Sequence, residues 1–130
     1  MNKWILLIVA AAGLALWFFA GRRHNSEISY VSISQEEAKK IMETAENYVI
    51  LDVRTHEEFQ TGHIPGARCL PLDEVAEKAK VFIPDQDMLY LVYCRSGRRS
   101  KEASQILAEL GYTNIREFGG ILDWPYEVER

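Results

Sequence analysis

Two nearly uninterrupted runs of apolar residues restrict this chain to few folds. Residues 48–53 read YVILDV and residues 88–93 read MLYLVY, with many β-branched or aromatic side chains. Such runs are typical of strands that are buried on both faces of a parallel sheet. Segments with apolar residues at helical spacing alternate with them, the clearest at positions 103, 106, 107 and 110. The alternation predicts an α/β domain with a central parallel sheet flanked by helices.

Weaker patterns complete this alternation. Short strands are expected at 30–33, 67–70 and 115–118, and a short helix at 73–80. Ser34 with Glu37, and Thr55 with Glu58, have the spacing of capping boxes, in which each side chain binds the other residue's backbone N–H. Each pair therefore predicts the start of a helix.

The first 23 residues differ from the rest of the chain. Residues 4–20 carry no charge and are followed by a glycine and two arginines. As a helix this segment would cover roughly 25 Å, slightly less than the ~30 Å core of a bilayer. Trp4 and the aromatic residues 17–19 lie at its two ends, where interfacial aromatic side chains belong. We expect a transmembrane anchor at 1–23, a linker at 24–29 and a folded domain at 30–130.

A cleaved signal peptide is the alternative for this segment. Cleavage requires small residues one and three positions before the cut, which Ala20 satisfies and Phe18 does not. The flanking charges are nearly balanced, because Lys3 opposes Arg22 and Arg23. We expect an uncleaved single-pass anchor with the soluble domain in the cytoplasm. The alternative is an extracytoplasmic domain, or a secreted one after cleavage.

The chain that follows this segment is acidic. Of 15 lysines and arginines three precede residue 24, which leaves 12 basic against 19 acidic side chains. Because neutralising nucleic-acid phosphates requires a broad basic surface, we expect no nucleic-acid binding. An anionic ligand would have to be attracted by a local basic cluster.

One such cluster adjoins one of the two cysteines. Residues 94–101 read CRSGRRSK and directly follow the second apolar run. Open α/β sheets bind their ligands at the carboxyl ends of strands, which is where Cys94 is expected. Gly97 permits a tight turn of backbone N–H groups, and Ser100 is the expected N-cap of the next helix.

These surroundings favour a thiolate, the nucleophilic form of cysteine. Loop N–H groups and a helix N-terminus stabilise negative charge, and three arginines add positive charge. The sequence therefore predicts Cys94 as a catalytic nucleophile. The residues expected to bind an anionic substrate are Arg95, Ser96, Gly97, Arg98, Arg99 and Ser100. The alternative is a packed cysteine beside a solvated basic surface.

Several spaced motifs resemble the single-domain rhodanese-like sulfurtransferases. They are LDVR at 51–54, EF at 58–59, GHIPGA at 62–67, the loop at 94–101, and FGG at 118–120 with Trp124. The resemblance covers roughly residues 31–128 and implies a doubly wound α/β fold. It also implies that Cys94 attacks the sulfane sulfur of thiosulfate or a related donor and releases sulfite. The resulting persulfide would pass its sulfur to cyanide or a thiol.

The residues are compatible with this chemistry. Thiosulfate is a dianion, so arginines of the loop are expected to pair with its oxygens, and loop N–H groups to stabilise the persulfide. No metal or organic cofactor is required, and no spacing of cysteine and histidine suggests a metal site. A protein is a possible sulfur donor or acceptor.

Two other functions use a similar loop. A membrane-tethered persulfide carrier or interaction module would not need fast turnover of small molecules. The active-site loop of cysteine-dependent phosphatases and arsenate reductases looks like a Cys followed by five residues and an Arg. Here the sixth residue after Cys94 is Ser100, so the loop is expected to be one residue too short for a phosphoryl group.

Five further residues have mainly structural interpretations. Cys69 is expected to pack in a strand, with a resolving thiol as the alternative. Asp52 and Arg54 are expected to anchor loops by hydrogen bonds, rather than to act in catalysis. His63 is expected to fix a turn, and Trp124 to pack in the core.

Overall fold

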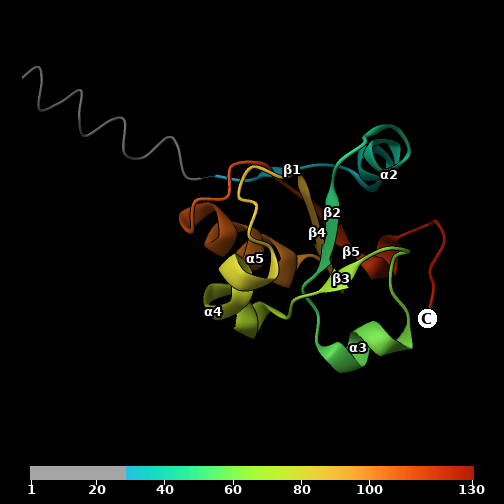
Figure 1. The fold of residues 1–130 in the computed structure, drawn as a ribbon. Helices are drawn as coiled ribbons and strands as arrows, with labels where there is room; N and C mark the ends of the chain where they lie inside the picture. Colours follow the sequence, from blue (N-terminus) through green and yellow to red (C-terminus); the bar gives the residue numbers. More distant parts are fainter. Residues whose placement is uncertain (1–28) are drawn as a thin grey trace, which may run out of the picture.

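The computed structural model describes residues 29–130 (Figure 1). Within these residues, five strands and four helices alternate, followed by one short 3-10 turn. In chain order they are β1 (Val31–Ser32), α2 (Gln35–Thr44), β2 (Val49–Asp52), α3 (His56–Thr61), β3 (Arg68–Cys69), α4 (Leu72–Phe82), β4 (Tyr90–Cys94), α5 (Arg98–Glu109), β5 (Ile115–Gly120) and η1 (Ile121–Asp123). The strands and helices alternate as the apolar patterns predict.

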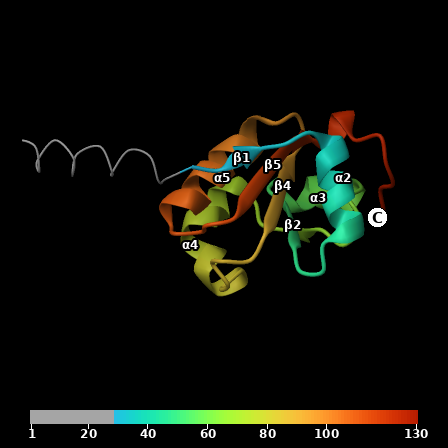
Figure 2. The same ribbon diagram turned by 90° about the horizontal axis from the view of Figure 1, so that it is seen from above.

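All five strands belong to one sheet in the order β1-β5-β4-β2-β3, and every pairing is parallel. β4 is the middle strand, and its residues are all buried. α4 and α5 cover one face of the sheet and α2 covers the other (Figure 2). The prediction of an α/β domain with a central parallel sheet flanked by helices is confirmed.

Two apolar clusters fill the space between the sheet and its helices. Alternate residues of β4 point to opposite faces. Tyr90, Val92 and Cys94 join the cluster beneath α4 and α5, whereas Leu91 and Tyr93 join the cluster beneath α2. The last residue of the central strand therefore faces the layer that contains α5.

The helix starts differ from the predictions in two respects. At α2, the Ser34 hydroxyl accepts the Glu37 N–H, but the described structure has no return bond in which the Ser34 N–H donates to the Glu37 carboxylate. Thr55 and Glu58 form the full capping box. The predicted N-cap of α5, Ser100, is wrong, because α5 already begins at Arg98.

The N-cap of α5 is Gly97, in a left-handed conformation at φ 112° and ψ −17°. That conformation suits glycine, which has no Cβ, and it turns the chain into the helix three residues after Cys94. Ser100 is consequently a first-turn residue whose hydroxyl is free to bind other parts of the site.

The predicted anchor (residues 1–23) lies outside the described residues, as does all but the last residue of the predicted linker (24–29). Within 29–130, none of the helices has both the length and the apolar character needed to cross a bilayer.

Candidate active site

Cys94 is the last residue of β4 and is 1% exposed to solvent. Directly after it the chain turns through Arg95, Ser96 and Gly97 into α5. The Gly97 N–H donates a hydrogen bond to Cys94 Sγ at 3.0 Å. The first-turn N–H groups of a helix have no partner within the helix, so α5 also presents positive potential at this end. The loop thus provides a setting that stabilises negative charge on sulfur.

A buried hydroxyl and a buried carboxylate lie behind the thiol. Cys94 Sγ lies 3.4 Å from Ser100 Oγ, to which it donates a hydrogen bond. Ser100 Oγ in turn donates to Glu117 Oε1 at 2.6 Å. Ser100 and Glu117 are 0% and 2% exposed. The three side chains form a continuous chain of hydrogen bonds from β4 through α5 to β5.

The three arginines of the loop take different positions. Arg95 and Arg98 are exposed, and the Arg98 side chain is 78% exposed with Glu102 at 3.7 Å. Arg99 turns away from the solvent and binds both carboxylate oxygens of Glu58, at 2.7 and 2.9 Å. Arg95 and Arg98 therefore offer accessible positive charge, while the charge of Arg99 is shared with an acidic partner.

The Glu58–Arg99 pair joins α3 to the start of α5. The hydrogen bonds from Arg99 lower the pKa of Glu58 to about 2, with smaller contributions from Thr55, against the opposing effect of burial. The same hydrogen bonds raise the pKa of Arg99. A bidentate pair of this kind fixes the guanidinium plane, so it fixes one side of the first turn of α5.

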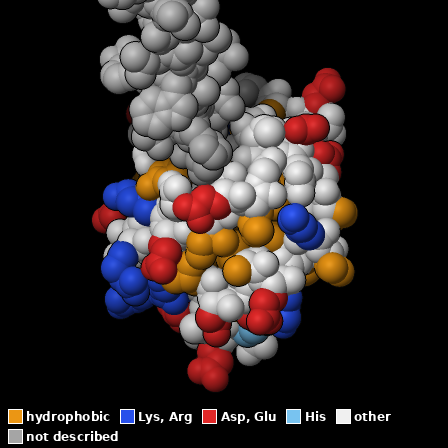
Figure 3. Space-filling view, turned by 90° about the vertical axis from the view of Figure 1, so that its left-hand side faces the viewer, with side chains coloured by type: hydrophobic (Ala, Val, Ile, Leu, Met, Phe, Trp, Pro, Cys, Tyr) orange, Lys and Arg blue, Asp and Glu red, His pale blue; other side chains and the backbone are white. Residues whose placement is uncertain are grey.

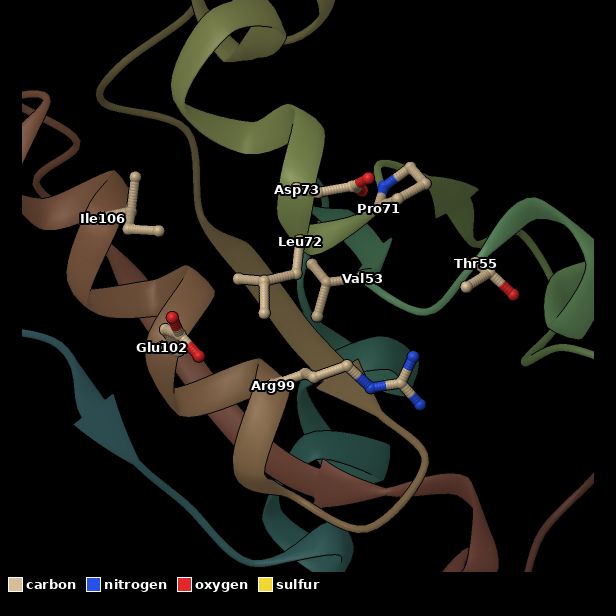
Figure 4. Close-up of a pocket in the computed structure, with 8 residues that line it drawn as sticks. All are labelled: Val53, Thr55, Pro71, Leu72, Asp73, Arg99, Glu102 and Ile106. Carbon is tan, nitrogen blue, oxygen red and sulfur yellow. The ribbon is translucent and has the colours of Figure 1, made fainter.

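A cavity of about 420 Å³ lies beside this pair, and Figure 4 shows the Arg99 side chain extending across it toward Thr55. Its remaining lining residues are Val53, Pro71, Leu72, Asp73, Glu102 and Ile106. The side of the molecule on which α4 and α5 lie shows a band of hydrophobic side chains with charged groups around it (Figure 3). The cavity is therefore an apolar hollow with charged residues among its walls, next to the active loop.

The other side of the Cys94 strand is held by a buried ion pair. Arg54 Nη2 lies 2.7 Å from Asp52 Oδ2 and also donates to Gly62 O at 2.7 Å. Tyr93, the neighbour of Cys94, donates to Asp52 Oδ2 at 2.7 Å and accepts from the Ile64 N–H. Burial is the largest single influence on Arg54 and lowers its pKa, but the hydrogen bond and the negative charge of Asp52, with smaller contributions from Tyr93, together raise the pKa of Arg54.

The other residues singled out by the sequence, His63, Trp124 and Cys69, make packing and hydrogen-bond contacts. His63 Nδ1 lies 3.0 Å from Phe59 O and its ring stacks on Phe59, as expected of a residue that fixes a turn. Trp124 is 8% exposed and packs on Phe118 in the core. Cys69 is half-buried, and burial raises its pKa to about 11.

No cluster of three potential metal ligands is present among residues 29–130. Glu117 and Gly120 are missing from the sequence-based list of site residues. The sequence offers only a weak signal for Glu117, because residues 115–118 read IREF and its neighbour Arg116 is charged as well. Gly120 belongs to the FGG motif at 118–120, but nothing in the sequence indicates that a Cβ atom there would meet the backbone of Arg95 and Ser96.

A family model described as a rhodanese-like domain matches residues 34–126. Thiosulfate sulfurtransferase PspE of Escherichia coli (strain K12) is 42% identical over 73 residues, which cover 56% of this chain and 70% of that protein. A sulfurtransferase of Allochromatium vinosum is 34% identical over 100 residues, which cover 76% of this chain and 87% of that protein. The chain also matches YrkF of Bacillus subtilis at 37% identity, over 60% of the length of that protein.

Solved structures of the same fold agree with these matches. A structure described as rhodanese with anions from E. coli has a TM-score of 0.60 at 37% identity, covering 64% of this chain and 98% of that chain. The protein SSP1007 from Staphylococcus saprophyticus has a TM-score of 0.68 at 29% identity, covering 77% of this chain and 99% of that chain.

Proposed function

Because the chain belongs to the rhodanese-like domain family of sulfurtransferases, we propose that it transfers the sulfane sulfur of thiosulfate or a related donor through a persulfide on Cys94. The observation that carries the proposal is the position of Cys94 Sγ, 3.0 Å from the Gly97 N–H at the N-terminus of α5. Such a position stabilises a thiolate and then a persulfide anion, because both carry their negative charge at the same end of the helix.

In the first step, the Cys94 thiolate attacks the outer sulfur of thiosulfate. A bond forms between Cys94 Sγ and that sulfur, while the sulfur–sulfur bond of the donor breaks and sulfite leaves with the bonding electron pair. The charge near the loop is the same before and after this exchange. The donors of the loop therefore need not reorganise during the step.

In the second step, cyanide or a thiolate attacks the outer sulfur of the persulfide. The new bond forms between the acceptor and that sulfur, and the Cys94 thiolate leaves. The enzyme thus returns to its first state without a metal or organic cofactor. The same two steps also accommodate the persulfide of another protein as the donor, or the thiol of another protein as the acceptor.

Arg95 and Arg98 are the proposed recruiters of the donor dianion, since both are exposed beside the loop. Arg99 is not among these recruiters, because its Nη1 and Nη2 atoms already donate to the two carboxylate oxygens of Glu58. Ser96 and Gly97 contribute backbone N–H groups, and the Ser100 hydroxyl lies next to the sulfur.

The same contacts disfavour a phosphatase. The sixth position after Cys94, at which a phosphatase loop would have an arginine, is occupied by the buried Ser100. Its hydroxyl donates to the Glu117 carboxylate rather than to the mouth of the loop. A phosphoryl group would find no bidentate arginine there.

The test is intact-mass spectrometry of the full chain after brief exposure to thiosulfate without reductant. We expect a gain of one sulfur, about 32 Da, in the unmodified protein and in Cys69→Ser, but not in Cys94→Ser. Addition of cyanide is expected to remove the gain. Absence of the adduct in a protein whose Cys94 still reacts with iodoacetamide would overturn thiosulfate as the donor.

We also propose that residues 4–20 tether the domain to a membrane, with residues 30–130 in the cytoplasm. The support is the uncharged segment with aromatic residues at its ends. A reporter fused after Arg130, read in both compartments together with membrane fractionation of the full chain, tests anchoring and orientation separately. Activity of an export-dependent reporter would contradict the cytoplasmic orientation.

A further inference from the structure

The cavity of about 420 Å³ lies on the side of the sheet toward which the Cys94 side chain points. Val53, one of its lining residues, follows Asp52, which pairs with Tyr93 in the parallel register of β2 and β4. The Val53 N–H donates to Tyr93 O at 3.0 Å, so Val53 and Cys94 are neighbours across the two strands. Adjacent strands lie about 5 Å apart. The wall of the cavity therefore begins beside Cys94.

The first turn of α5 borders the cavity from a second direction. Arg99 lines the cavity and directly precedes Ser100, whose hydroxyl oxygen lies 3.4 Å from Cys94 Sγ. Thr55, toward which the Arg99 side chain extends, is an exposed lining residue (Figure 4). The cavity is thus open to solvent at Thr55, and it adjoins Cys94 both across the sheet and through the start of α5.

The walls of the cavity are mostly aliphatic. Leu72 and Ile106 are half-buried and pack against the same cluster as Val53, and Pro71 adds to this surface. Figure 4 shows Val53 and Leu72 next to each other, with Ile106 projecting from α5. Such walls offer water few hydrogen bonds, so the burial of ligand methylene groups against them is favourable. A volume of about 420 Å³ is at the lower end of the range for small-molecule sites and suits a short chain.

The charges at the rim disfavour an anion. Asp73 on α4 and Glu102 on α5 are exposed lining residues, and Arg99 is the one basic residue among the described residues of the lining. Glu58 already balances the charge of Arg99, and Arg98 lies 3.7 Å from Glu102. Asp73 forms no ion pair within residues 29–130. The unbalanced charge at the rim is therefore that of Asp73, and it is negative.

We propose that this cavity binds the sulfur acceptor, and that the acceptor is a short aliphatic thiol without a negative charge. The inference rests on the proposed function, because it names the acceptor class of that reaction. The donor dianion is attracted by Arg95 and Arg98 on the exposed side of the loop, whereas the acceptor approaches from between α4 and α5. The two substrates then reach Cys94 by different routes, each with the charge that suits it.

The transfer step balances with these two reactants. The acceptor thiol attacks the outer sulfur of the Cys94 persulfide anion, and the thiol proton passes to that sulfur. A sulfur–sulfur bond to the acceptor forms while the sulfur–sulfur bond to Cys94 breaks. Cys94 leaves as the thiolate, and the acceptor leaves as its own persulfide. The number of negative charges is one before and after the step.

The test follows sulfur transfer from the loaded protein to three thiols. The full chain is exposed to thiosulfate, freed of excess and mixed with mercaptoethanol, mercaptobutanol or mercaptobutanoate, while intact mass reports the loss of one sulfur. Rate constants are expressed per thiolate. We expect mercaptobutanol to react about tenfold faster than mercaptoethanol, the scale of burying two further methylene groups. Mercaptobutanoate has the same number of carbons and is expected to react about threefold more slowly than mercaptobutanol, because the rim repels its carboxylate.

Two substitutions test the walls and the rim separately. Ile106→Thr keeps the branch at Cβ but places a hydroxyl on the wall, and it is expected to reduce the advantage of mercaptobutanol over mercaptoethanol to about threefold. Asp73→Asn removes the rim charge and is expected to bring mercaptobutanoate to within about twofold of mercaptobutanol. Transfer to cyanide, which has no chain to bury, is expected to stay unchanged in Ile106→Thr, whereas a displaced loop would slow it.

Each substitution has a matched control on α2, at the opposite face of the sheet. Ile41→Thr makes the same change in a half-buried isoleucine that packs on the other apolar cluster. Glu36→Gln removes a carboxylate from the second position of α2, as Asp73→Asn does from the second position of α4. Neither control is expected to alter the ratios among the three thiols.

Two results would overturn the proposal in a protein that takes up sulfur from thiosulfate. One is equal rate constants for mercaptoethanol and mercaptobutanol. The other is a set of ratios in Ile106→Thr and Asp73→Asn that matches the ratios in their controls, because the cavity would then have no part in choosing the acceptor.

A second measurement needs no sulfur donor and separates this proposal from the proposed function. Methanethiosulfonates with hydroxyethyl, hydroxybutyl or carboxypropyl chains react with Cys94 in a Cys69→Ser background. Cys94 Sγ attacks the sulfur that carries the chain, a disulfide forms, and methanesulfinate leaves with the bonding electron pair. Rates in the order hydroxybutyl, carboxypropyl, hydroxyethyl support the cavity even if thiosulfate leaves no adduct, in which case only the proposed donor fails. Equal rates for the hydroxyethyl and hydroxybutyl reagents would contradict the cavity.

Discussion

The backbone of Gly120 packs directly against the carbonyl of Arg95, the residue that follows Cys94, the proposed nucleophile. A Cβ atom built on Gly120 would lie 2.0 Å from Arg95 O and 2.5 Å from the Ser96 nitrogen. The backbone of Gly120 is extended, so the need for glycine here is steric and not conformational. Leu122 N–H also donates to Arg95 O at 3.2 Å. The end of β5 therefore forms the wall that holds the loop over Cys94.

Replacing Gly120 by alanine is expected to displace this loop. The methyl group would meet backbone atoms, which cannot rotate away as the end of a side chain can. We expect the free energy of unfolding to fall by at least ~2 kcal/mol, within the range of overpacking and strain effects. Sulfur transfer per folded molecule is expected to fall further, because the Gly97 N–H would leave Cys94 Sγ. Thermal unfolding and the rate of sulfur transfer from thiosulfate measure the two effects.

Gly66→Ala is a suitable control for this variant. Gly66 has φ 82°, but a Cβ atom there would meet nothing within 4 Å. This change is expected to lower stability modestly through backbone strain and to leave sulfur transfer per folded molecule unchanged. Equal transfer by Gly120→Ala and Gly66→Ala would contradict the assigned role of Gly120.

Arg98 is expected to act on substrate capture through charge alone. Its side chain is 78% exposed, and its nearest acidic partner, Glu102, is 3.7 Å away at the surface. For Arg98→Gln we expect KM for thiosulfate to rise about threefold with little change in kcat, as for loss of a screened surface charge. High salt is expected to reduce the difference. Lys40→Gln on α2, at the opposite face of the sheet, is the control; an equal change in KM there would indicate a general charge effect.

Glu58 is expected to stabilise the domain in a pH range that its bond to Arg99 defines. The pKa of Glu58 falls from 4.5 to about 2 on folding, chiefly because Arg99 donates to it. A lowered pKa contributes stability that is present above pH 4.5 and is lost as the pH falls toward 2. Glu58→Gln is therefore expected to be less stable than the unchanged protein above pH 5, with the difference disappearing near pH 2.

Glutamine at position 58 retains the hydrogen-bonding groups of the capping box with Thr55, so this variant isolates the ion pair. Chemical denaturation at a series of pH values measures the difference. Glu57→Gln is the matched control, since Glu57 is exposed and forms no ion pair in the described structure. A stability difference for Glu58→Gln that persists at pH 2 would show that the pair is not its cause.

The parallel sheet and the position of Cys94 could be predicted because they depend on local patterns. The apolar runs at 48–53 and 88–93 become β2 and β4, and the strand order places Cys94 at the carboxyl end of the middle strand. Hydrophobic periodicity reports which residues are buried, and it does so within a single element.

Contacts between distant parts of the chain could not be read in this way. Glu58 appears in the sequence as one half of a capping box, yet it also binds Arg99 on another helix. Ser100 appears as an N-cap, although Gly97 takes that position and leaves the serine hydroxyl for Glu117. In each case, one side chain satisfies a local pattern and the tertiary structure gives it a second or a different partner.

Cys69 is expected to remain unreactive in the folded protein. It is half-buried, its Sγ lies 3.6 Å from Arg54 O, and burial together with the negative charge of Asp52 raises its pKa to about 11. At pH 8 only about one molecule in a thousand would then carry a Cys69 thiolate, the form that reacts with alkylating agents.

Peptide mapping after a short reaction with iodoacetamide at pH 8 is expected to find label on Cys94 alone. In denaturant both cysteines are expected to react. A resolving role for Cys69 requires it to attack the Cys94 persulfide, so rapid labelling of Cys69 in the folded chain, or a Cys69–Cys94 disulfide after thiosulfate exposure, would contradict the packing interpretation.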